Sequence, residues 1–534
     1  MRLAAVLVAA VLGLSSAGWD GASASSTAPA VSSYTPVITF RSCGTDQCAD
    51  FVVPLDWANP DGQKITLAVR VHRATGTSKG ILLANPGGPG ASGTGLADFL
   101  PDNIPGGVGS QYDVVGWDIR GTGDSTPSLH CDSKFFGVDR PDFVPRTHRL
   151  MRVWKKKTAR YAARCGASTA AAQGLLAHMS TEDNARDMEA LRDAIRTATG
   201  NPVYDKLNFY GFSYGTYLGQ VYATLFPGKV GLFVLDGVVD PTNYWYGANL
   251  KQEIWFDRNL STFFKWIAQH PSAYHLGRSW RAIRHGYFAQ LRRLDRHPAA
   301  HGKLGPDELT DAIINAPYYV FNWDYLAYAY SRLVRAGQGG PMFRVYRESN
   351  MGDDNGYAVY LGVQCTDAPH PSWKKQRRDA WRIHRKHPYL AWDNTWFNAP
   401  CLRWPAPSRT PFVVDGTTTT GKFLLVNETR DAATPYSGAL RVRSLFPGSA
   451  LIAGVGGTTH AGSLSGVGCV DDRIASFLSS GMLPPRLAGN RADVECPAVK
   501  PPPAYAGRLA ASGRHAAPSS PLPGRNLLAP GWRF

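Results

Sequence analysis

A serine between two glycines is the strongest chemical signal in this sequence. Gly211, Ser213 and Gly215 form the pattern G-x-S-x-G, with a strand-like segment before them and a helical segment after them. In a nucleophile elbow the serine lies on a sharp, strained turn between a strand and a helix, and small residues two positions away let the chain pass close to itself. The pattern alone also occurs in ordinary glycine-rich turns, but this context predicts that Ser213 is a nucleophile.

A histidine has to take the proton of this serine, because a neutral hydroxyl is a poor nucleophile. In an elbow-type site the histidine follows the acid in chain order. The histidines in the last hundred residues are His460 and His515, and His515 lies in a Pro- and Arg-rich segment without periodicity. His460 follows a predicted strand, and sites of open α/β sheets form at such strand ends. We therefore predict that His460 is the base; an incidental loop histidine is the alternative.

The acid that orients this histidine is expected just after the preceding strand. Glu428 and Asp431 both follow the apolar run at 423–426. Asp431 precedes a turn ending at Pro435 that would present its carboxylate inward, so we predict Asp431 and keep Glu428 as the alternative acid. Its role would be to accept the ring proton of His460, fix the tautomer and stabilise the imidazolium. A surface-turn aspartate without a catalytic role is the other interpretation.

Attack on a carbonyl group creates an oxyanion, and hydrogen-bond donors must already point toward it. The elbow provides the backbone amide of Tyr214, and a second amide is expected from the loop after the third strand. That loop, residues 85–90, has the sequence Asn-Pro-Gly-Gly-Pro-Gly, and we assign the second amide to Gly88. A phosphate-binding loop is the rival interpretation, but the loop lacks the pattern G-x-x-x-x-G-K-[ST].

The segments around these residues alternate between strands and helices. Helical periodicity predicts a crossover helix over 180–199, another over 218–225 and a last one near 470–478. This alternation is typical of a doubly wound, mostly parallel sheet of the α/β class. Short apolar or alternating runs predict the strands 51–54, 65–72, 80–84, 112–117, 206–211, 229–235, 421–426 and 449–454.

Residues 241–404 interrupt this alternation. Trp, Tyr, Arg and His are abundant there, helical periodicity dominates, and a buried-strand pattern is missing. We predict a large helical insertion at 241–404, which divides the α/β core into 41–240 and 405–490. A chain of this length exceeds what one core usually fills, so an insertion or a second domain is expected.

The ends of the chain have compositions of their own. Arg2 precedes an apolar run from Leu3 to Leu14, and Ala22-Ser-Ala24 offers a cleavage site. This pattern predicts a secretory signal peptide over 1–24 and a secreted protein; an uncleaved anchor is the alternative. The run is shorter than the roughly 20 residues of a spanning helix, so we expect no stable membrane insertion. Residues 25–40 are predicted to be a flexible leader, and 497–534 a Pro-rich disordered tail.

Eight cysteines in an exported chain favour disulfides over thiol chemistry or a metal site. Eight cysteines permit 105 pairings, so pairing by proximity in the sequence is a hypothesis. It joins Cys43 with Cys48, Cys131 with Cys165, Cys365 with Cys401, and Cys469 with Cys496.

The formal charge of +16 would suit a nucleic acid or an anionic surface. However, the Lys and Arg residues are dispersed and no nucleic-acid motif accompanies them, so we expect no nucleic-acid partner. His384 and His387 have a spacing that could hold zinc on a helix, but a third ligand nearby is missing. We therefore predict a solvated basic helix there, and neither a metal nor another cofactor for the protein.

Further motifs carry a resemblance to a known family. The sequence resembles, from about residue 38 to 490, secreted tripeptidyl aminopeptidases and their relatives, the prolyl-aminopeptidase-like branch of α/β-hydrolases. The loop at 86–90 looks like the family's HGGPG, with Pro86 where many members have His. Since the amide donor would come from Gly88, the Pro at position 86 does not affect the predicted oxyanion hole. The other matching segments are 53–57 (VPLDW), 117–125 (WDIRGTGDS), 211–216 (GFSYGT), 364–367 (QCTD) and 401–405 (CLRWP).

The resemblance implies an α/β-hydrolase fold with a helical cap between the sixth and seventh strands, and the same Ser213, Asp431 and His460. It also implies a serine exopeptidase that acts on peptides with a free amino terminus, although carboxylesterases share the pattern. A non-catalytic binding protein on this scaffold is a third hypothesis, since fold alone does not fix function. Aminopeptidases need an anion for the substrate ammonium, and the sequence leaves six candidates open: Glu253, Asp257, Asp324, Asp353, Asp354 and Asp367.

Overall fold

The computed structural model describes residues 34–243 and 245–504. The predicted signal peptide, the first part of the predicted leader and residues 505–534 of the predicted tail lie outside the described residues. The fold below is that of the described part.

A mixed sheet forms the centre of the described chain. Its strands lie in the order β1-β2-β3-β5-β4-β6-β7-β8-β9-β10. The first four in this order pair antiparallel and the remaining neighbours pair parallel. The predicted α/β class with a mostly parallel sheet is thereby confirmed. The bounds are β1 Arg41–Cys43, β2 Asp46–Pro54, β3 Lys64–His72, β4 Ile81–Asn85, β5 Asp113–Trp117, β6 Leu207–Phe212, β7 Val230–Asp236, β8 Lys422–Glu428, β9 Ser449–Val455 and β10 Val494–Pro497.

Helices cover both faces of this sheet because successive strand residues point to opposite sides. Phe209 belongs to the hydrophobic cluster on one face, and its neighbour Tyr210 belongs to the cluster on the other. Residues of α4, α5 and α17 pack in the first cluster and those of α1 and α18 in the second. The bounds are α1 Leu96–Asn103, α4 Thr181–Thr199, α5 Tyr214–Leu225, α17 Ser437–Leu445 and α18 Gly468–Ser480.

The crossover helix α4 begins and ends at residues whose types favour helix ends. The side chain of Ser180 accepts from the amide of Asp183, and the Asp183 carboxylate accepts from the amide of Ser180, which forms a capping box at the first turn. Gly200 ends the helix in the left-handed conformation. The predicted span of this helix is confirmed.

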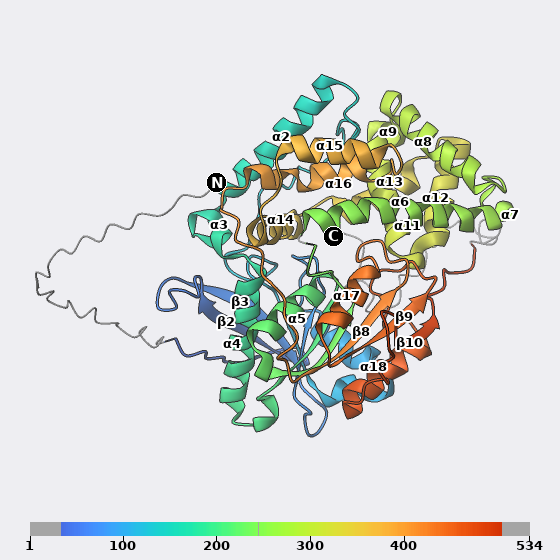
Figure 1. The fold of residues 1–534 in the computed structure, drawn as a ribbon. Coiled ribbons are helices and arrows are strands. Elements are labelled where there is room, and N and C mark those ends of the chain that lie inside the picture. The colour runs from blue at the N-terminus through green and yellow to red at the C-terminus, as the bar shows by residue number, and fades with distance from the viewer. Residues whose placement is uncertain (1–33, 244, 505–534) are drawn as a thin grey trace, which may run out of the picture.

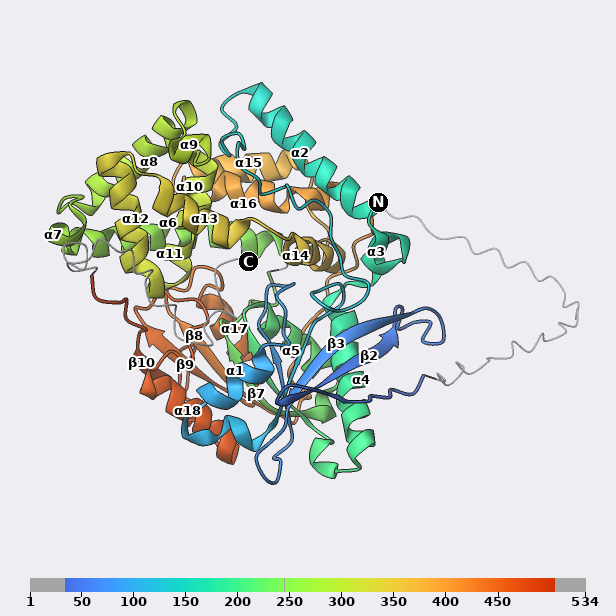
Figure 2. The same cartoon turned by 180° about the vertical axis from the view of Figure 1, so that it is seen from behind.

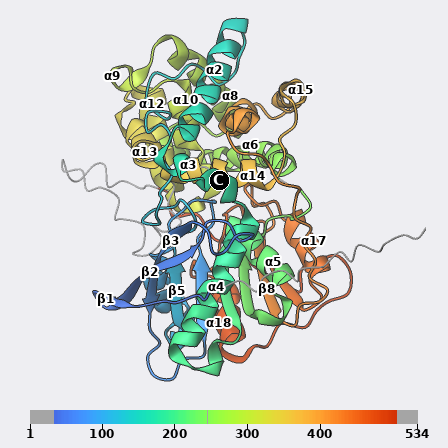
Figure 3. The same cartoon turned by 90° about the vertical axis from the view of Figure 1, so that its left-hand side faces the viewer.

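A layer of helices lies over one edge of the sheet and forms the cap (Figure 1, Figure 2). These helices come between β7 and β8 in the chain and have a hydrophobic cluster of their own, rich in aromatic rings. The side view shows the cap on one side and the sheet with its helices on the other (Figure 3). The bounds are α6 Tyr246–Gln269, α7 Pro271–Tyr274, α8 Trp280–Arg296, α9 Ala299–Gly302, α10 Pro306–Ile313, α11 Asn315–Tyr318, α12 Trp323–Ala336, α13 Gly340–Asn350, α14 Asn355–Asp367, α15 Trp373–His384 and α16 Ala391–Asn398.

A second part of the chain contributes to the cap. The helix α2 (His148–Gly166) lies between β5 and α4 in the sequence, yet it runs beside α15 and α16 (Figure 1, Figure 2). The ring of Trp154 stacks on that of Trp396, with centroids 5.8 Å apart. The predicted core at 41–240 includes this segment, because the sequence shows that α2 is amphipathic but not which surface it covers.

Four disulfides connect the described chain, and they have the pairing expected from proximity in the sequence. The Cys131–Cys165 bridge ties α2 to the loop after β5, and the Cys365–Cys401 bridge ties α14 to the segment after α16. Free cysteines are absent from the described residues. The disulfide hypothesis is confirmed.

The described ends of the chain pack on the sheet. In the predicted leader, the hydroxyl of Tyr34 donates to the carbonyl of Val52 (2.9 Å). In the predicted tail, Pro497 is the last residue of β10, and the amide of Val499 donates to Glu428 (2.7 Å). Some residues of the predicted leader and tail therefore make contacts with the sheet. Of the described helices, none combines the length and the apolar character needed to cross a membrane.

Candidate active site

The elbow at the end of β6 has the strained geometry that its sequence predicts. Ser213 has φ 53° and ψ −121°, a backbone conformation that residues other than glycine rarely adopt. A Cβ at Gly211 would lie 2.7 Å from the carbonyl of Gly215, and one at Gly215 would lie 2.7 Å from the carbonyl oxygen of Asn85. Glycine is therefore required at both positions for the turn to close.

Asp431 and His460 form a buried pair at the carboxyl ends of β8 and β9. The Oδ2 atom of Asp431 lies 2.8 Å from Nδ1 of His460, and the two side chains are 0% and 2% exposed. Asp431 also accepts from the amides of Ala433 (2.9 Å) and Thr434 (3.0 Å) and from the Thr434 hydroxyl (2.7 Å). These bonds fix the carboxylate, which in turn fixes the imidazole ring.

The other ring nitrogen of His460 is open. Its Nε2 is buried and has no hydrogen-bond partner within the described residues. A hydrogen bond from Ser213 to this atom is also absent there, and such bonds are often long or misaligned until a substrate is bound. The pair therefore leaves free the ring atom that a general base would use.

Glu428, the alternative acid, is occupied elsewhere. Its Oε2 accepts from the amide of Thr459 (2.5 Å) and its Oε1 accepts from the amide of Val499 (2.7 Å). Burial raises the pKa of Glu428 to about 8. These contacts hold the loop that carries His460, so the geometry favours Asp431 over Glu428 as the partner of the ring.

The loop after β4 lies directly against the elbow. A Cβ at Gly87 would be 2.5 Å from the carbonyl oxygen of Phe212 and 2.9 Å from Cβ of Ser213. The amide of Gly87 is engaged by Oδ1 of Asn85 (2.9 Å), whereas Gly88 lines the same small pocket, of about 40 Å³, as Ser213 and Tyr214. The arrangement supports Gly88 and Tyr214 as the two donors toward an oxyanion.

Asp236 is a buried residue of this site that the sequence analysis missed. It ends β7; its carbonyl oxygen accepts from the amide of Ser213 (2.8 Å), and its carboxylate accepts from the amide of Ser463 (2.8 Å). Burial raises the pKa of Asp236 to about 6. Asp236 thus ties the elbow to the His460 loop. An acid at the end of a buried strand is the sequence signal that would have identified it.

Residues of the cap contact His460 and cover it. The carbonyl of Tyr318, at the end of α11, accepts from the His460 amide (2.8 Å), and the ring of Tyr318 meets the imidazole edge-on with centroids 5.9 Å apart. The ring of Tyr319 is also close, at 6.4 Å between centroids. Aromatic rings from the cap therefore shield the imidazole from solvent.

Asp257 and Asp367 are two of the six acids considered for a substrate ammonium, and both are engaged in structural contacts. Asp257 pairs with Arg284 (2.8 Å) and lies 3.4 Å from Nδ1 of His387. Asp367 accepts from the amide and hydroxyl of Thr181 and from the indole of Trp245. Since His387 faces Asp257, the contacts give no support to a shared metal site with His384.

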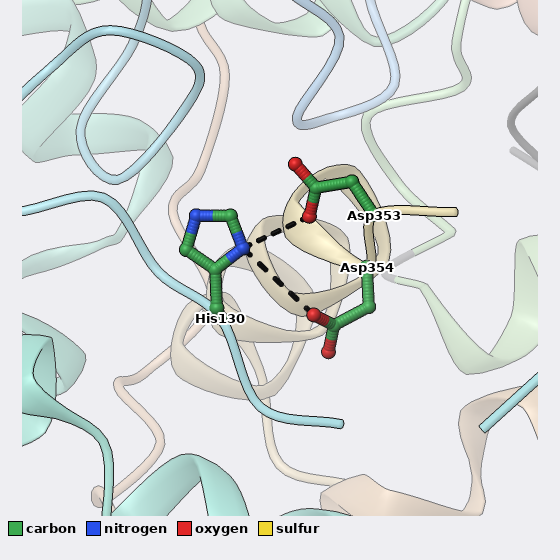
Figure 4. Close-up of side chains that lie close together, drawn as sticks. All are labelled: His130, Asp353 and Asp354. Carbon is green, nitrogen blue, oxygen red and sulfur yellow. Dashed lines mark hydrogen bonds and ion pairs between the residues drawn. The ribbon is translucent and has the colours of Figure 1, made fainter. Parts of the chain in front are cut away.

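Asp353 and Asp354 lie together with His130 (Figure 4). Nδ1 of His130 is 2.9 Å from Oδ1 of Asp353 and 3.9 Å from Oδ1 of Asp354. One histidine and two carboxylates at this spacing could bridge a metal ion. The other oxygen of Asp354 accepts from the amides of Cys131 and Asp132 and from the hydroxyl of Tyr161. These contacts anchor the start of α14 to the loop after β5.

Glu253, on α6, is the most deeply buried of the six acids. It is 1% exposed, and its Oε2 has no hydrogen-bond partner in the described chain. Burial raises its pKa well above the ordinary value. Its neighbours Asn249 and Gln252 line the Ser213 pocket, and Gln252 also lines a second pocket together with Asp393. The sequence named Glu253 among six candidates, and only the structure distinguishes it.

Known proteins resemble this chain over most of its length. A family described as "TAP-like protein" matches residues 387–496. The "Tripeptidyl aminopeptidase" of Streptomyces lividans is 36% identical over 489 residues, which cover 87% of this chain and 88% of that protein. The "Serine protease Hip1" of Mycobacterium tuberculosis is 29% identical and covers 82% and 86% of the two chains. A "Carboxylesterase B" of Mycobacterium tuberculosis is 31% identical and covers 83% and 85%.

Proposed function

This chain belongs to the tripeptidyl-aminopeptidase-like family of α/β-hydrolases and is a serine hydrolase, and on this basis we propose that it is a secreted exopeptidase. It releases short peptides, tripeptides in particular, from the free amino terminus of peptide substrates. The similarity to peptidases supports peptide substrates, and the arrangement around Ser213 supports the chemistry that follows.

The reaction proceeds through an acyl-enzyme. The hydroxyl of Ser213 attacks the scissile carbonyl while Nε2 of His460 takes its proton, so that a bond from Oγ to the carbonyl carbon forms. His460 then gives the proton to the leaving amine as the C–N bond breaks. Water, deprotonated by the same nitrogen, hydrolyses the ester and restores Ser213. Asp431 keeps the imidazole in the tautomer that leaves Nε2 free to accept.

The negative charge that develops on the carbonyl oxygen is stabilised by the amides of Gly88 and Tyr214. Both residues line the pocket of Ser213. One donor of this kind typically lowers the barrier by about 3 to 4 kcal/mol. Because Gly88 lies in a loop packed against the elbow, the donors are in place before the substrate arrives.

Glu253 holds the substrate ammonium in this proposal. Its open oxygen is the observation that carries the exopeptidase assignment, because a buried acceptor without a donor costs free energy that a bound ammonium removes. An extended tripeptide spans about 10 Å, which is the separation between the ammonium and the scissile bond that this proposal requires. Gln252, the residue before Glu253, lines both the pocket of Ser213 and a pocket in the cap, which supports a substrate path between them.

The test compares one peptide with a free and an acetylated amino terminus. Mass spectrometry over a time course should show removal of amino-terminal tripeptides from the free form only, without internal fragments. Internal fragments, or equal cleavage of the two forms, would contradict exopeptidase action. Because one relative is named a carboxylesterase, short acyl esters belong in the same series, and faster turnover of the esters than of free tripeptide anilides would favour that second function.

Export is supported by the four disulfides, since such bridges persist in oxidising compartments. Edman sequencing of the protein recovered from culture medium should find a start close to residue 25. A protein retained in the cell with its disulfides unformed would contradict secretion.

A further inference from the structure

A larger cavity, separate from the two pockets that Gln252 lines, lies inside the cap. Its volume is about 240 Å³, and an engineered apolar cavity of about 150 Å³ is known to bind benzene. The walls include the rings of Phe143, Phe288 and Tyr389. This cap cavity shares no lining residue with the pocket of Ser213 among the described residues. It therefore has the size and the walls for a small molecule of its own.

Three polar atoms of residues that line this cavity have no hydrogen-bond partner within residues 34–243 and 245–504. They are Oδ2 of Asp307, Nε1 of Trp392 and Nδ1 of His384. Asp307 and Trp392 are each 1% exposed. Burial of an unsatisfied polar group is costly. Two acceptors and a donor among the lining residues of one cavity suit a ligand that carries both a donor and an acceptor.

The charge around Asp307 favours a cation. Its Oδ1 accepts from the amide of Phe143 (2.8 Å), which leaves Oδ2 open. The nearby guanidinium of Arg140 is already bound to Glu308 (3.3 Å) and Asp311 (2.6 Å). Burial raises the pKa of Asp307 well above its ordinary value. A ligand ammonium would supply the missing positive partner and keep the carboxylate ionised.

The open end of the cavity carries the opposite charge. Arg146 and Arg292 line it and are exposed to solvent. Arg146 already pairs with Asp142, whereas no ion pair of Arg292 occurs among the described residues. The two arginines make the entrance positive, which attracts a ligand that carries a carboxylate.

We propose that the cap cavity binds a free α-amino acid with an aromatic or large apolar side chain. The ammonium donates to Oδ2 of Asp307, the carboxylate accepts from Nε1 of Trp392, and the side chain packs against the ring of Tyr389. This site is distinct from the catalytic pocket and goes beyond the proposed function. Asp393 lines both the cap cavity and the pocket that contains Gln252, so the bound amino acid lies beside the path assigned to the substrate.

The test is isothermal titration calorimetry of the full-length protein with L-phenylalanine, phenethylamine and 3-phenylpropionate. L-Phenylalanine should bind saturably, phenethylamine should bind more weakly, and 3-phenylpropionate at least about tenfold more weakly than L-phenylalanine, because it lacks the ammonium. Asp307→Asn should weaken L-phenylalanine at least about tenfold, and Trp392→Phe should weaken it while keeping the aromatic wall. Asp367→Asn is the matched control, in a buried carboxylate that does not line this cavity, and should leave this binding unchanged.

Leu291→Trp provides a variant that does not touch the polar groups. Leu291 is half-buried on the cavity wall, so a larger side chain there should fill the space and abolish binding even if Asp307→Asn fails to fold. Absence of saturable binding to the folded wild-type protein would overturn the proposal. So would retention of binding by Leu291→Trp, or loss of binding in Asp367→Asn with none in Asp307→Asn, because these results place the ligand elsewhere.

Discussion

Asp431, after the carboxyl end of β8, and Glu253, in the cap, are both buried carboxylates, yet their surroundings differ. Asp431 accepts hydrogen bonds from Ala433, Thr434 and His460. Glu253 keeps an oxygen without a partner in the described structure. A carboxylate surrounded by donors is fixed in one orientation, whereas an open oxygen can receive a donor from a ligand. The comparison indicates that the carboxyl ends of the strands hold fixed polar groups, and that the cap holds a polar group that is still able to bind a ligand.

The largest effect is expected from Asp431→Asn. The amide cannot fix the same imidazole tautomer, so kcat should fall by about 10⁴-fold while the protein stays folded. Steady-state kinetics with a tripeptide anilide, together with circular dichroism, would measure both. Glu428→Gln is the control at the same strand end and should keep kcat within about tenfold of the wild type. A large loss of kcat in Glu428→Gln, with kcat retained in Asp431→Asn, would show that Glu428 is the acid.

Removal of the cap disulfide should have the next largest effect, on stability. The double replacement Cys365→Ser with Cys401→Ser should lower the free energy of unfolding by about 2 to 4 kcal/mol, because the bridge constrains the unfolded chain. The bridge spans 36 residues, whereas Cys43–Cys48 spans 5. Removal of the short bridge should cost about 1 to 2 kcal/mol less. Urea unfolding would measure both, and equal losses would contradict the loop-length argument.

Glu253→Gln tests whether the unpartnered oxygen of Glu253 binds the substrate ammonium. Loss of the ionic partner should lower kcat/KM for peptides with a free amino terminus by about 10- to 100-fold. Acetylated peptides and acyl esters, which carry no ammonium, should be cleaved at nearly the wild-type rate. Glu253→Asp keeps the charge and should fall between the two. An equal loss on all three substrate types would mean that Glu253 supports the fold and does not recognise the amine.

The last prediction concerns the pH dependence of stability, and over a single pH unit its effect is the smallest of the four. The pKa of Glu428 in the folded state is raised from 4.5 to about 8, so between these values the folded state holds a proton that the unfolded state has lost. Stability from this group is therefore present below pH 4.5 and declines as pH rises to 8, by at most about 1.4 kcal/mol per pH unit. Urea unfolding at several pH values should show a steeper decline for the wild type than for Glu428→Gln. Parallel profiles would contradict the raised pKa.

The strands and the elbow could be predicted because their signals are local. A buried strand, a glycine pair and a helix follow one another around Ser213, and their order along the chain is also their order in space. His460 and Asp431 could be named because a strand precedes each of them. The structure brings these two into contact, and their catalytic roles stay predictions.

Contacts between distant segments could not be predicted in the same way. Nothing local to α2 shows that it packs on α16, and nothing local to Tyr318 shows that it covers His460. Glu253 could not be separated from five other acids, because the hydrogen bonds of Asp257, Asp354 and Asp367 come from residues far away in the sequence. Burial and pairing are properties of the assembled fold.

Labelling with a fluorophosphonate probe tests the central claim most directly. The probe reacts with a serine only when a base and an oxyanion site activate it. Intact-mass analysis of the folded protein should show a single adduct, and peptide mapping should place it on Ser213. Ser213→Ala should fold normally and carry no adduct. An unlabelled wild-type protein, or an adduct that persists in Ser213→Ala, would contradict the assignment of Ser213 as the nucleophile.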